Sequence, residues 1–227
     1  MQKTKVVHLT IVHKRYDSRI FCKECISLSE AGYDVSLIVA DGLGNETKQG
    51  VKIIDVGRAE ASRIKRMIRT SRKAVDLALG MNADIYHFHD PDLLIEALRL
   101  RKKACVIFDS HEDFPALMKQ RDYIPDFARK VLFRLCTLIE KYSAKRLSAV
   151  VCATETIQDK FARYGNIRAV VVKNYPVFSS CENETTNSYD TTKPVCYVGG
   201  LTALRGVKEM VEACNKAGVK LLLAGEF

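Results

Sequence analysis

The stretch VCYVGGLTALRG, residues 195–206, has the pattern of a buried strand, a glycine turn and the first turn of a helix. A helical pattern follows in VKEMVEACNKAG (207–218), and a second apolar strand pattern in VKLLLAGEF (219–227). A strand, a helix and a parallel strand form one unit of an α/β sheet, and a single unit cannot bury its own apolar faces. The rest of the chain therefore decides which fold this unit belongs to.

Strand and helix patterns alternate through the preceding residues. Short runs rich in β-branched residues predict strands, and amphipathic runs between them predict helices. The predicted strands are 5–12, 34–41, 51–57, 83–90, 104–113, 148–154 and 167–176, and the predicted helices are 18–31, 60–80, 91–103, 126–147 and 156–165. This alternation predicts an α/β fold, a parallel sheet with helices on both faces. Such sheets bind ligands outside the carboxyl ends of their strands.

The run SSCENETTNSYDTTKP (179–194) is polar and has almost no large apolar side chain, which is the composition of a linker. We therefore predict a first complete domain at 1–178 and a linker at 179–194. Residues 195–227 are then the first strand–helix–strand unit of a second, incomplete domain.

Composition narrows the class of protein. The chain has 227 residues, of which 47% are hydrophobic, so it can bury a sizeable core. No apolar run reaches the ~18–20 residues of a membrane span, and the first residues lack the apolar region and cleavage site of a signal peptide. We expect a cytoplasmic protein. The eight cysteines include one CxxC (Cys22 and Cys25) but no second pair at metal-ligand spacing, so we expect free thiols.

The formal charge of +9 is concentrated in RAEASRIKRMIRTSRK (58–73) and RLRKK (99–103). A basic face attracts nucleic acid, an anionic membrane or an anionic substrate, or it is simply a solvated helix face. The run 58–73 contains no aromatic residue, and the chain has no recognisable nucleic-acid-binding motif. We therefore expect no nucleic acid partner.

Histidines and carboxylates gather where predicted strands end. The residues are His8, His13, His87, His89 and His111, with Asp17, Asp90, Asp109, Glu112 and Asp113 beside them. A lone histidine is usually structural, but the carboxyl ends of parallel strands share one edge of the sheet, so several of these side chains are expected to converge there. HFH (87–89) with carboxylates is a conceivable metal site. The sequence identifies no closing ligand, so we expect no metal.

The turn after the first strand is HKRYDSRIF (13–21), without the glycines of a GxGxxG motif. This argues against NAD or FAD at that edge. Its polar side chains suit a polar or anionic ligand. Alternatively, it is an ordinary charged loop in which Asp17 or Ser18 caps the following helix.

The glycine turn of the opening stretch differs from that loop. Gly199 and Gly200 follow a strand, and Arg205 stands where the next helix begins. Backbone N–H groups at a helix start, together with a cation, suit a diphosphate. The alternative is a tight turn without a ligand.

Five segments occur in a fixed order: HKRYDSRIFCKECISLSEAGYDVSLIVAD (13–41), DIYHFHDPDLL (84–94), VIFDSHEDFP (106–115), VVVKNYP (170–176) and YVGGLTALRGVKEMVEA (197–213). In this order and spacing they resemble bacterial family-4 glycosyltransferases of the GT-B fold, which build cell-surface polysaccharide. The resemblance runs the whole length of the chain. It implies two Rossmann-like domains facing across a cleft, with the acceptor on the N-terminal one and the nucleotide-sugar on the C-terminal one. It also implies a truncated chain that lacks activity, because the later part of the second domain is missing.

The resemblance implies retaining transfer from a nucleotide-sugar to a hydroxyl, without a metal or other cofactor. Arg205 stands in RG where most members have KG, and would hold the donor diphosphate with Gly199 and Gly200. Many members carry a second basic residue where this chain has Gly200, a departure that bears on donor affinity. His111, in DSHED, matches the family's cleft histidine and is the expected catalytic residue. No catalytic base is assigned.

The resemblance also implies an acceptor site on the first domain. The residues expected there are His13, Lys14, Asp17, Arg19, His89, Asp90 and Glu112. Acceptors in such pathways are often lipid-linked, so the basic runs 58–73 and 127–147 suggest peripheral association with the inner face of the cytoplasmic membrane. A solvated basic face is the alternative.

Two other functions remain open at this point. The chain could be a non-catalytic remnant that keeps only an acceptor or partner site, or a GT-B sugar-nucleotide epimerase, which shares the fold and the donor. Assays of donor hydrolysis and product analysis distinguish them from a transferase.

Overall fold

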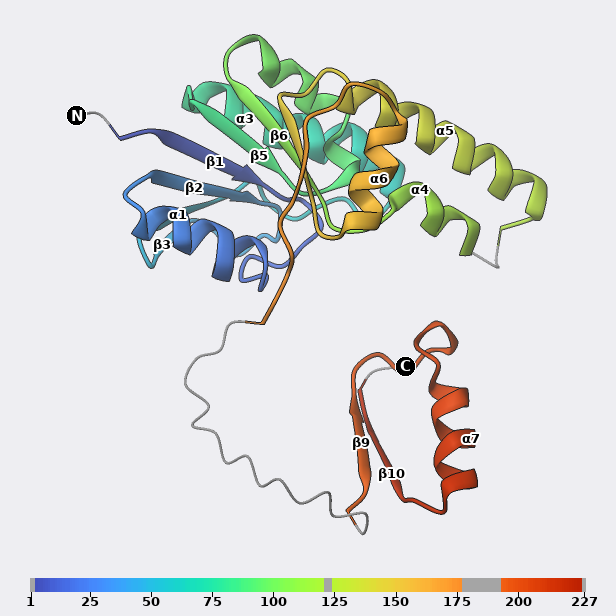
Figure 1. Cartoon of the computed structure of the whole chain (residues 1–227). Helices are drawn as coiled ribbons and strands as arrows, with labels where there is room; N and C mark the ends of the chain where they lie inside the picture. The colour runs from blue at the N-terminus through green and yellow to red at the C-terminus, as the bar shows by residue number, and fades with distance from the viewer. Residues whose placement is uncertain (1–2, 121–123, 177–192, 226–227) are drawn as a thin grey trace. The chain divides into compact units, whose positions relative to one another are not determined.

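A computed structural model describes residues 3–120, 124–176 and 193–225. The chain divides into two compact units, Met1–Pro176 and Val177–Phe227 (Figure 1). The predicted linker lies outside the described residues except for its last two positions, and the domain boundaries drawn at 178 and 194 stay predictions.

The first unit contains a parallel sheet with one antiparallel edge strand (Figure 1). The strand order is β3-β4-β2-β1-β5-β6-β7-β8. Their bounds are β1 Lys5–Leu9, β2 Asp34–Val39, β3 Glu46–Lys48, β4 Val51–Asp55, β5 Ile85–Phe88, β6 Cys105–Ser110, β7 Ala149–Cys152 and β8 Ala169–Val171. All seven predicted strands of this region are present, and the α/β prediction is confirmed. β3 was not predicted. It pairs antiparallel with β4 across the tight turn at Gln49 and Gly50.

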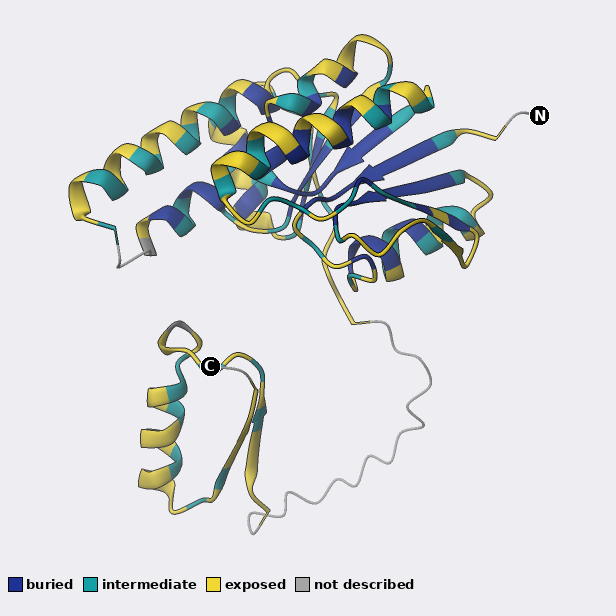
Figure 2. Ribbon diagram, turned by 180° about the vertical axis from the view of Figure 1, so that it is seen from behind, coloured by how far each residue is buried: buried dark blue, intermediate teal, exposed yellow. Residues whose placement is uncertain are grey.

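Helical segments cover the sheet. They are η1 Ile20–Cys25, α1 Ile26–Glu30, α2 Arg63–Lys65, η2 Arg66–Thr70, α3 Ser71–Met81, η3 Pro91–Leu93, η4 Glu96–Lys102, α4 Phe114–Leu117, η5 Met118–Gln120, α5 Asp126–Ala144 and α6 Glu155–Arg163. The buried strands lie beneath helices that expose their outer sides (Figure 2). Among the described residues, none of the helices combines the length and the apolar character that a membrane span requires.

Alternation along the strands separates two apolar clusters. Val35, Leu37 and Val39 pack with Ile20 and Phe21 of η1. The intervening Ile38 belongs instead to a larger cluster that includes residues of α3, η4 and α6. Because successive strand residues point to opposite faces, η1 covers one face of the sheet and the larger group of helices covers the other.

The segment predicted as a helix at 91–103 forms two 3₁₀ helices, η3 and η4, and no α-helix. Leu94, Ala97 and Leu100 are all buried and are spaced three residues apart. A 3₁₀ helix has three residues per turn, so this spacing forms a single buried stripe. In a regular α-helix the same three positions would spread over an arc of about 120°.

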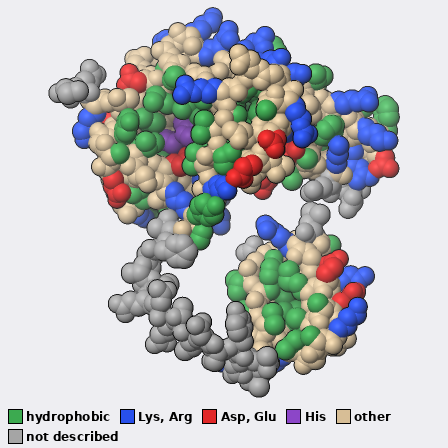
Figure 3. Space-filling view, in the orientation of Figure 1, with side chains coloured by type: hydrophobic (Ala, Val, Ile, Leu, Met, Phe, Trp, Pro, Cys, Tyr) green, Lys and Arg blue, Asp and Glu red, His purple; other side chains and the backbone are tan. Residues whose placement is uncertain are grey.

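The second unit holds β9 Val195–Val198, η6 Ala203–Arg205, α7 Val207–Ala217 and β10 Leu221–Ala224, with β9 and β10 parallel. Gly206 and Gly218 flank α7 with φ of 71° and 67°, the left-handed region that favours glycine. Apolar side chains remain exposed over this unit (Figure 3): Val195, Val198, Val211, Leu222 and Leu223.

Candidate functional site

The topological switch point of the first sheet lies between β1 and β5. The chain leaves β1 toward β2 on one side, and β5 joins β1 on the other side. Loops that leave the carboxyl ends of two such strands diverge and open a crevice, where open α/β sheets bind ligands. The register pairs His8 with His87, so the loops carrying His13 and Asp90 leave the sheet next to each other.

Three histidines are buried together beneath η1. His8 and His87 alternate with residues of the larger apolar cluster, so their rings point to the opposite face, which η1 covers. His8 Nδ1 lies 3.0 Å from His89 Nε2, and the His87 and His89 ring centroids are 4.7 Å apart. Burial is the main cause that lowers the pKa of all three rings, that of His87 to about 3. The rings are therefore neutral at physiological pH.

A buried ion pair adjoins the histidines. Arg19 donates from Nε to Asp109 Oδ2 (2.8 Å) and from Nη2 to Asp109 Oδ1 (2.9 Å), and its Nη1 donates to the Val172 carbonyl (2.9 Å). Burial opposes ionisation of Asp109, but hydrogen bonds from His111, His89 and Arg19 hold its pKa well below the ordinary value. Asp109 is therefore a fixed negative charge at the end of β6.

Glu24 of η1 faces the same cluster. Its Oε1 lies 3.2 Å from Arg19 Nε, and its Oε2 lies 3.9 Å from the nearest nitrogens of His87 and His89. Burial and the neighbouring Asp109 raise the pKa of Glu24 to about 9. Glu24 is thus protonated near neutral pH. Its neutral carboxyl group can therefore lie beside the Asp109 carboxylate without charge repulsion.

His111 reaches from this buried cluster toward the surface. Its Nε2 lies 3.2 Å from Asp109 Oδ2 and 3.4 Å from His89 Nδ1. The ring is partly exposed, unlike the rings of His8 and His89, and it lines a pocket. Asp109 therefore fixes the orientation of a ring that a ligand in the pocket would meet.

Asp90 organises the loop after β1. It accepts hydrogen bonds from Thr10 Oγ1 (3.0 Å) and from the backbone N–H groups of Ile11 and Val12. His13 Nε2 lies 3.4 Å from the other oxygen of Asp90. Asp90 is almost fully buried, and these contacts make it an anchor for the loop.

Asp17 caps the helix that follows. It accepts hydrogen bonds from the backbone N–H groups of Arg19 (2.9 Å) and Ile20 (3.0 Å), and it lies 3.6 Å from His13 Nδ1. This is the capping arrangement considered as the alternative for the loop 13–21. Asp17 and Asp90 together hold the His13 ring at the crevice.

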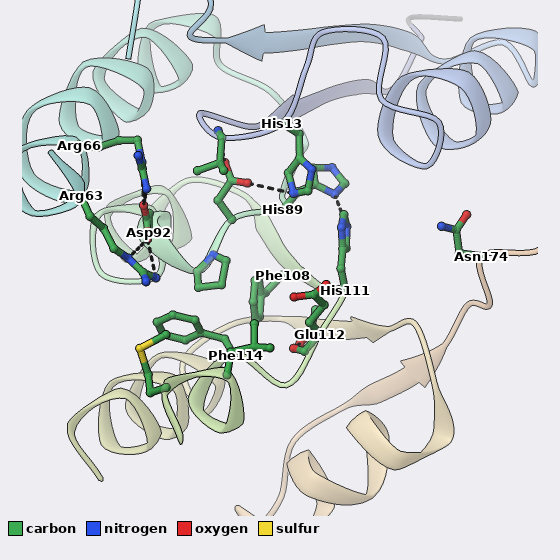
Figure 4. Close-up of a pocket in the computed structure, with 16 residues that line it drawn as sticks. His13, Arg63, Arg66, His89, Asp92, Phe108, His111, Glu112, Phe114 and Asn174 are labelled. Atoms are coloured by element: carbon green, nitrogen blue, oxygen red, sulfur yellow. Dashed lines mark hydrogen bonds and ion pairs between the residues drawn. The ribbon is translucent and has the colours of Figure 1, made fainter. Parts of the chain in front are cut away.

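A pocket of about 510 Å³ opens at this edge of the sheet (Figure 4). Five predicted site residues line it: His13, His89, Asp90, His111 and Glu112. Lys14, Asp17 and Arg19 do not line it. Lys14 is exposed, while Arg19 is buried and engaged with Asp109. Their assignment to the acceptor stays a prediction, and for Asp17 and Arg19 the contacts indicate a supporting role.

A family model described as Glycosyltransferase Family 4 matches residues 23–174. The chain belongs to this glycosyltransferase family. The match spans β2 to β8 and most of the residues of the pocket, and it leaves out β1, the loop after it and the second unit. No curated protein sequence matches the chain.

Solved structures of two other proteins share the fold of this glycosyltransferase chain. Sucrose-phosphate synthase from Thermosynechococcus elongatus superposes with a TM-score of 0.68 at 14% identity, covering 97% of this chain and 62% of that one. HepE from Anabaena, solved with UDP and glucose, superposes with a TM-score of 0.57 at 10% identity, covering 99% of this chain and 70% of that one. The fold is of the GT-B type. The chain spans 62% of the length of the sucrose-phosphate synthase.

The residues predicted to bind the donor of this glycosyltransferase all lie in the second unit. Gly199 and Gly200 follow β9, and Arg205 is an exposed residue that ends η6, two positions before α7 begins. The backbone of Gly225, just past β10, approaches Gly199 so closely that a Cβ on Gly225 would collide with it. The glycines thus shape the strand ends, and the roles of Gly199, Gly200 and Arg205 toward a donor stay predictions.

Two groups of side chains meet the spacing of metal ligands, namely His8, Glu24, His87 and His89, and His89, Asp109 and His111. The fold thus brings further potential ligands, which the sequence did not identify, next to His87 and His89. However, the guanidinium of Arg19 lies within 3.2 Å of oxygens of both carboxylates. That fixed positive charge disfavours a dication there, and the expectation of no metal stays a prediction.

Sequence reasoning missed one residue of the buried cluster and two residues of the pocket in this family member. Glu24 was only part of a helical pattern. Arg63 and Arg66 were assigned to a basic membrane-facing run, yet both line the pocket and bind Asp92 (Figure 4). The spacing of three residues between the arginines was visible in the sequence, but their carboxylate partner was not.

Proposed function

We propose that this chain carries the acceptor-binding side of a retaining glycosyltransferase that transfers a sugar from a nucleotide-sugar to a glycan or lipid-linked acceptor in cell-surface polysaccharide synthesis. The observation that carries the proposal is His111, which is oriented by Asp109 and partly exposed in a pocket at the switch point of a Glycosyltransferase Family 4 chain. Shape, polarity and family membership all favour a hydroxyl-bearing ligand at this place.

His111 would act on the sugar or on the acceptor hydroxyl through hydrogen bonding. Asp109 accepts at Nε2, which leaves the Nδ1 edge of the ring for a ligand. Transfer forms a bond between the acceptor oxygen and the anomeric carbon and breaks the bond from that carbon to the diphosphate oxygen. The negative charge develops on the departing diphosphate, which takes up the proton of the acceptor hydroxyl. Fixed cations and backbone N–H groups stabilise such a leaving group, and Gly199, Gly200 and Arg205 of the second unit are the groups we assign to it. No metal is required in this proposal.

The donor is proposed to carry a nucleoside diphosphate, UDP or GDP, and UDP is the first probe. HepE, which shares the fold, was solved with UDP and glucose. The proposal for this chain rests on the glycine turn and on Arg205, whose charge suits any nucleoside diphosphate.

We also propose peripheral association with the cytoplasmic face of the membrane through α5. The apolar side chains Phe127, Val131, Leu135, Leu138 and Tyr142 are exposed along it. At 100° per residue these five positions fall within an arc of about 80°, which forms a single stripe. Lys130, Arg134, Lys141 and Arg146 accompany the stripe. An apolar stripe beside basic residues is the pattern of a helix that lies in a membrane interface.

The test is ligand binding by the 227-residue chain. We expect UDP to bind in calorimetry, and we expect Arg205→Ala to weaken it about tenfold, as for loss of one charge-assisted contact. Lys208→Ala, at an exposed lysine of α7, is the control. We expect no transfer from this chain alone, and we expect His111→Ala to weaken the binding of an acceptor analogue at least about tenfold.

Other outcomes separate the alternatives. Epimerised sugar-nucleotide without an acceptor product would identify an epimerase. Binding of acceptor analogues without any UDP binding would identify a non-catalytic binding protein. Either result would overturn the transferase proposal.

A further inference from the structure

Two arginines stand side by side at one end of the pocket. Arg63 of α2 and Arg66 of η2 are three residues apart on one continuous helical stretch, so their side chains share a face. Arg63 donates from Nε and Nη2 to Asp92 Oδ1 (3.2 and 3.1 Å), and Arg66 donates from Nε to Oδ2 (2.9 Å). One carboxylate thus fixes two guanidinium groups (Figure 4).

The charges at this end of the pocket do not balance. Asp92 is almost fully buried and carries one negative charge, against two positive charges on the arginines. Within the described residues, neither Nη1 atom has a hydrogen-bond partner. A single arginine would neutralise Asp92. The second leaves a surplus positive charge, with N–H donors, at the pocket wall.

Beside the arginines, one part of the pocket wall is apolar. Phe108, Phe114, Leu117 and Met118 line it, and the Arg63 guanidinium lies 4.9 Å from the centroid of the Phe114 ring. His111 lines the same pocket. The pocket therefore presents a positive group, an apolar wall and a polar hydrogen-bonding group to one ligand.

We propose that Arg63 and Arg66 form an anion subsite for a phosphate or diphosphate ester whose apolar portion packs against Phe114 and Met118. This deepens the proposed function and rests on it, because it defines the acceptor as a phosphorylated amphiphile. Paired guanidinium groups match phosphate oxygens, which offer several acceptors in fixed directions. The arginines act as binding residues, and the Asp92 carboxylate competes with an anionic ligand for their positive charge.

Calorimetry with geranyl diphosphate, a soluble probe with both features, tests the subsite. We expect the 227-residue chain to bind it, and to bind inorganic pyrophosphate, geraniol and geranic acid more weakly. Arg63→Gln and Arg66→Gln should each weaken geranyl diphosphate binding at least about tenfold. Arg69→Gln, on the same helical stretch but exposed beside Glu60, is the matched control and should bind as the parent does.

Asp92→Asn separates ligand binding from a merely structural role. It removes the negative charge and keeps both arginines, so binding should be at least as tight as in the parent chain. Equal binding by the parent and both arginine variants, equal binding of geranic acid, or a loss in Asp92→Asn as large as in the arginine variants would each overturn the subsite. The probe needs neither donor nor turnover, so failure here is distinct from failure of sugar transfer.

Discussion

Arg19 and Asp109 form a two-pronged ion pair in the interior, with Nε–Oδ2 at 2.8 Å and Nη2–Oδ1 at 2.9 Å. The two residues are ninety positions apart in the sequence. The pair connects η1 to the end of β6 and holds the carboxylate that orients His111. Stability and site geometry therefore depend on the same contact.

Arg19→Met should destabilise the chain by about 3–5 kcal/mol, because it leaves the Asp109 carboxylate buried without its partner. Urea unfolding measures the loss. The control is Arg99→Met, which breaks a surface pair with Asp76 and should cost at most about 1 kcal/mol. Equal losses in the free energy of unfolding would show that the buried pair stabilises the chain no more than a surface pair does.

Glu24→Gln should change how stability depends on pH. The pKa of Glu24 is raised from 4.5 to about 9 in the folded chain, so its contribution to stability is fully present below pH 4.5 and is lost as the pH rises toward 9. The free energy of unfolding of the parent should therefore fall relative to Glu24→Gln by up to about 1.4 kcal/mol per pH unit in this window.

Urea unfolding at several pH values between 5 and 8 provides the comparison. Glu30→Gln, at an exposed glutamate of α1, is the control and should follow the parent. A constant difference between the parent and Glu24→Gln over this range would contradict the protonated state of Glu24.

The histidine cluster should hold no tightly bound metal. Arg19 places a positive charge beside both carboxylates, and protonated Glu24 is a poor ligand. We expect fewer than about 0.1 zinc per chain by elemental analysis, and an unchanged unfolding midpoint after EDTA dialysis. Stoichiometric zinc that His8→Ala loses would contradict this and would make the cluster a metal centre.

The stripe on α5 should bind anionic vesicles. We expect the chain to co-sediment with phosphatidylcholine vesicles that contain phosphatidylglycerol, and less with phosphatidylcholine alone or at high salt. Leu135→Glu and Leu138→Glu should each reduce binding, since each puts a negative charge on the apolar stripe. Leu43→Glu, at an exposed leucine distant in sequence from α5, is the control. Vesicle binding that depends neither on lipid charge nor on these substitutions would contradict the proposal.

The sequence by itself determined the alternation of strands and helices, since that alternation follows from local periodicity. Runs such as 34–39 and 105–110 carry their strand pattern without any reference to their neighbours. It also determined that the ends of β1, β5 and β6 bear histidines and carboxylates, and thus where a site had to form. The short strand β3 and the 3₁₀ form of 96–102 were missed, because a three-residue strand and a period of three are weak local signals.

Only the tertiary structure decided which of those side chains meet. The register of β1 against β5 and the placement of η1 over one face bring Glu24 and Arg19 to His87 and Asp109. The same holds for Arg63 and Arg66, whose shared partner Asp92 lies more than 25 residues away along the chain. Periodicity tells which face a side chain occupies, but the pairing of faces depends on strand order and helix packing, which are properties of the whole fold.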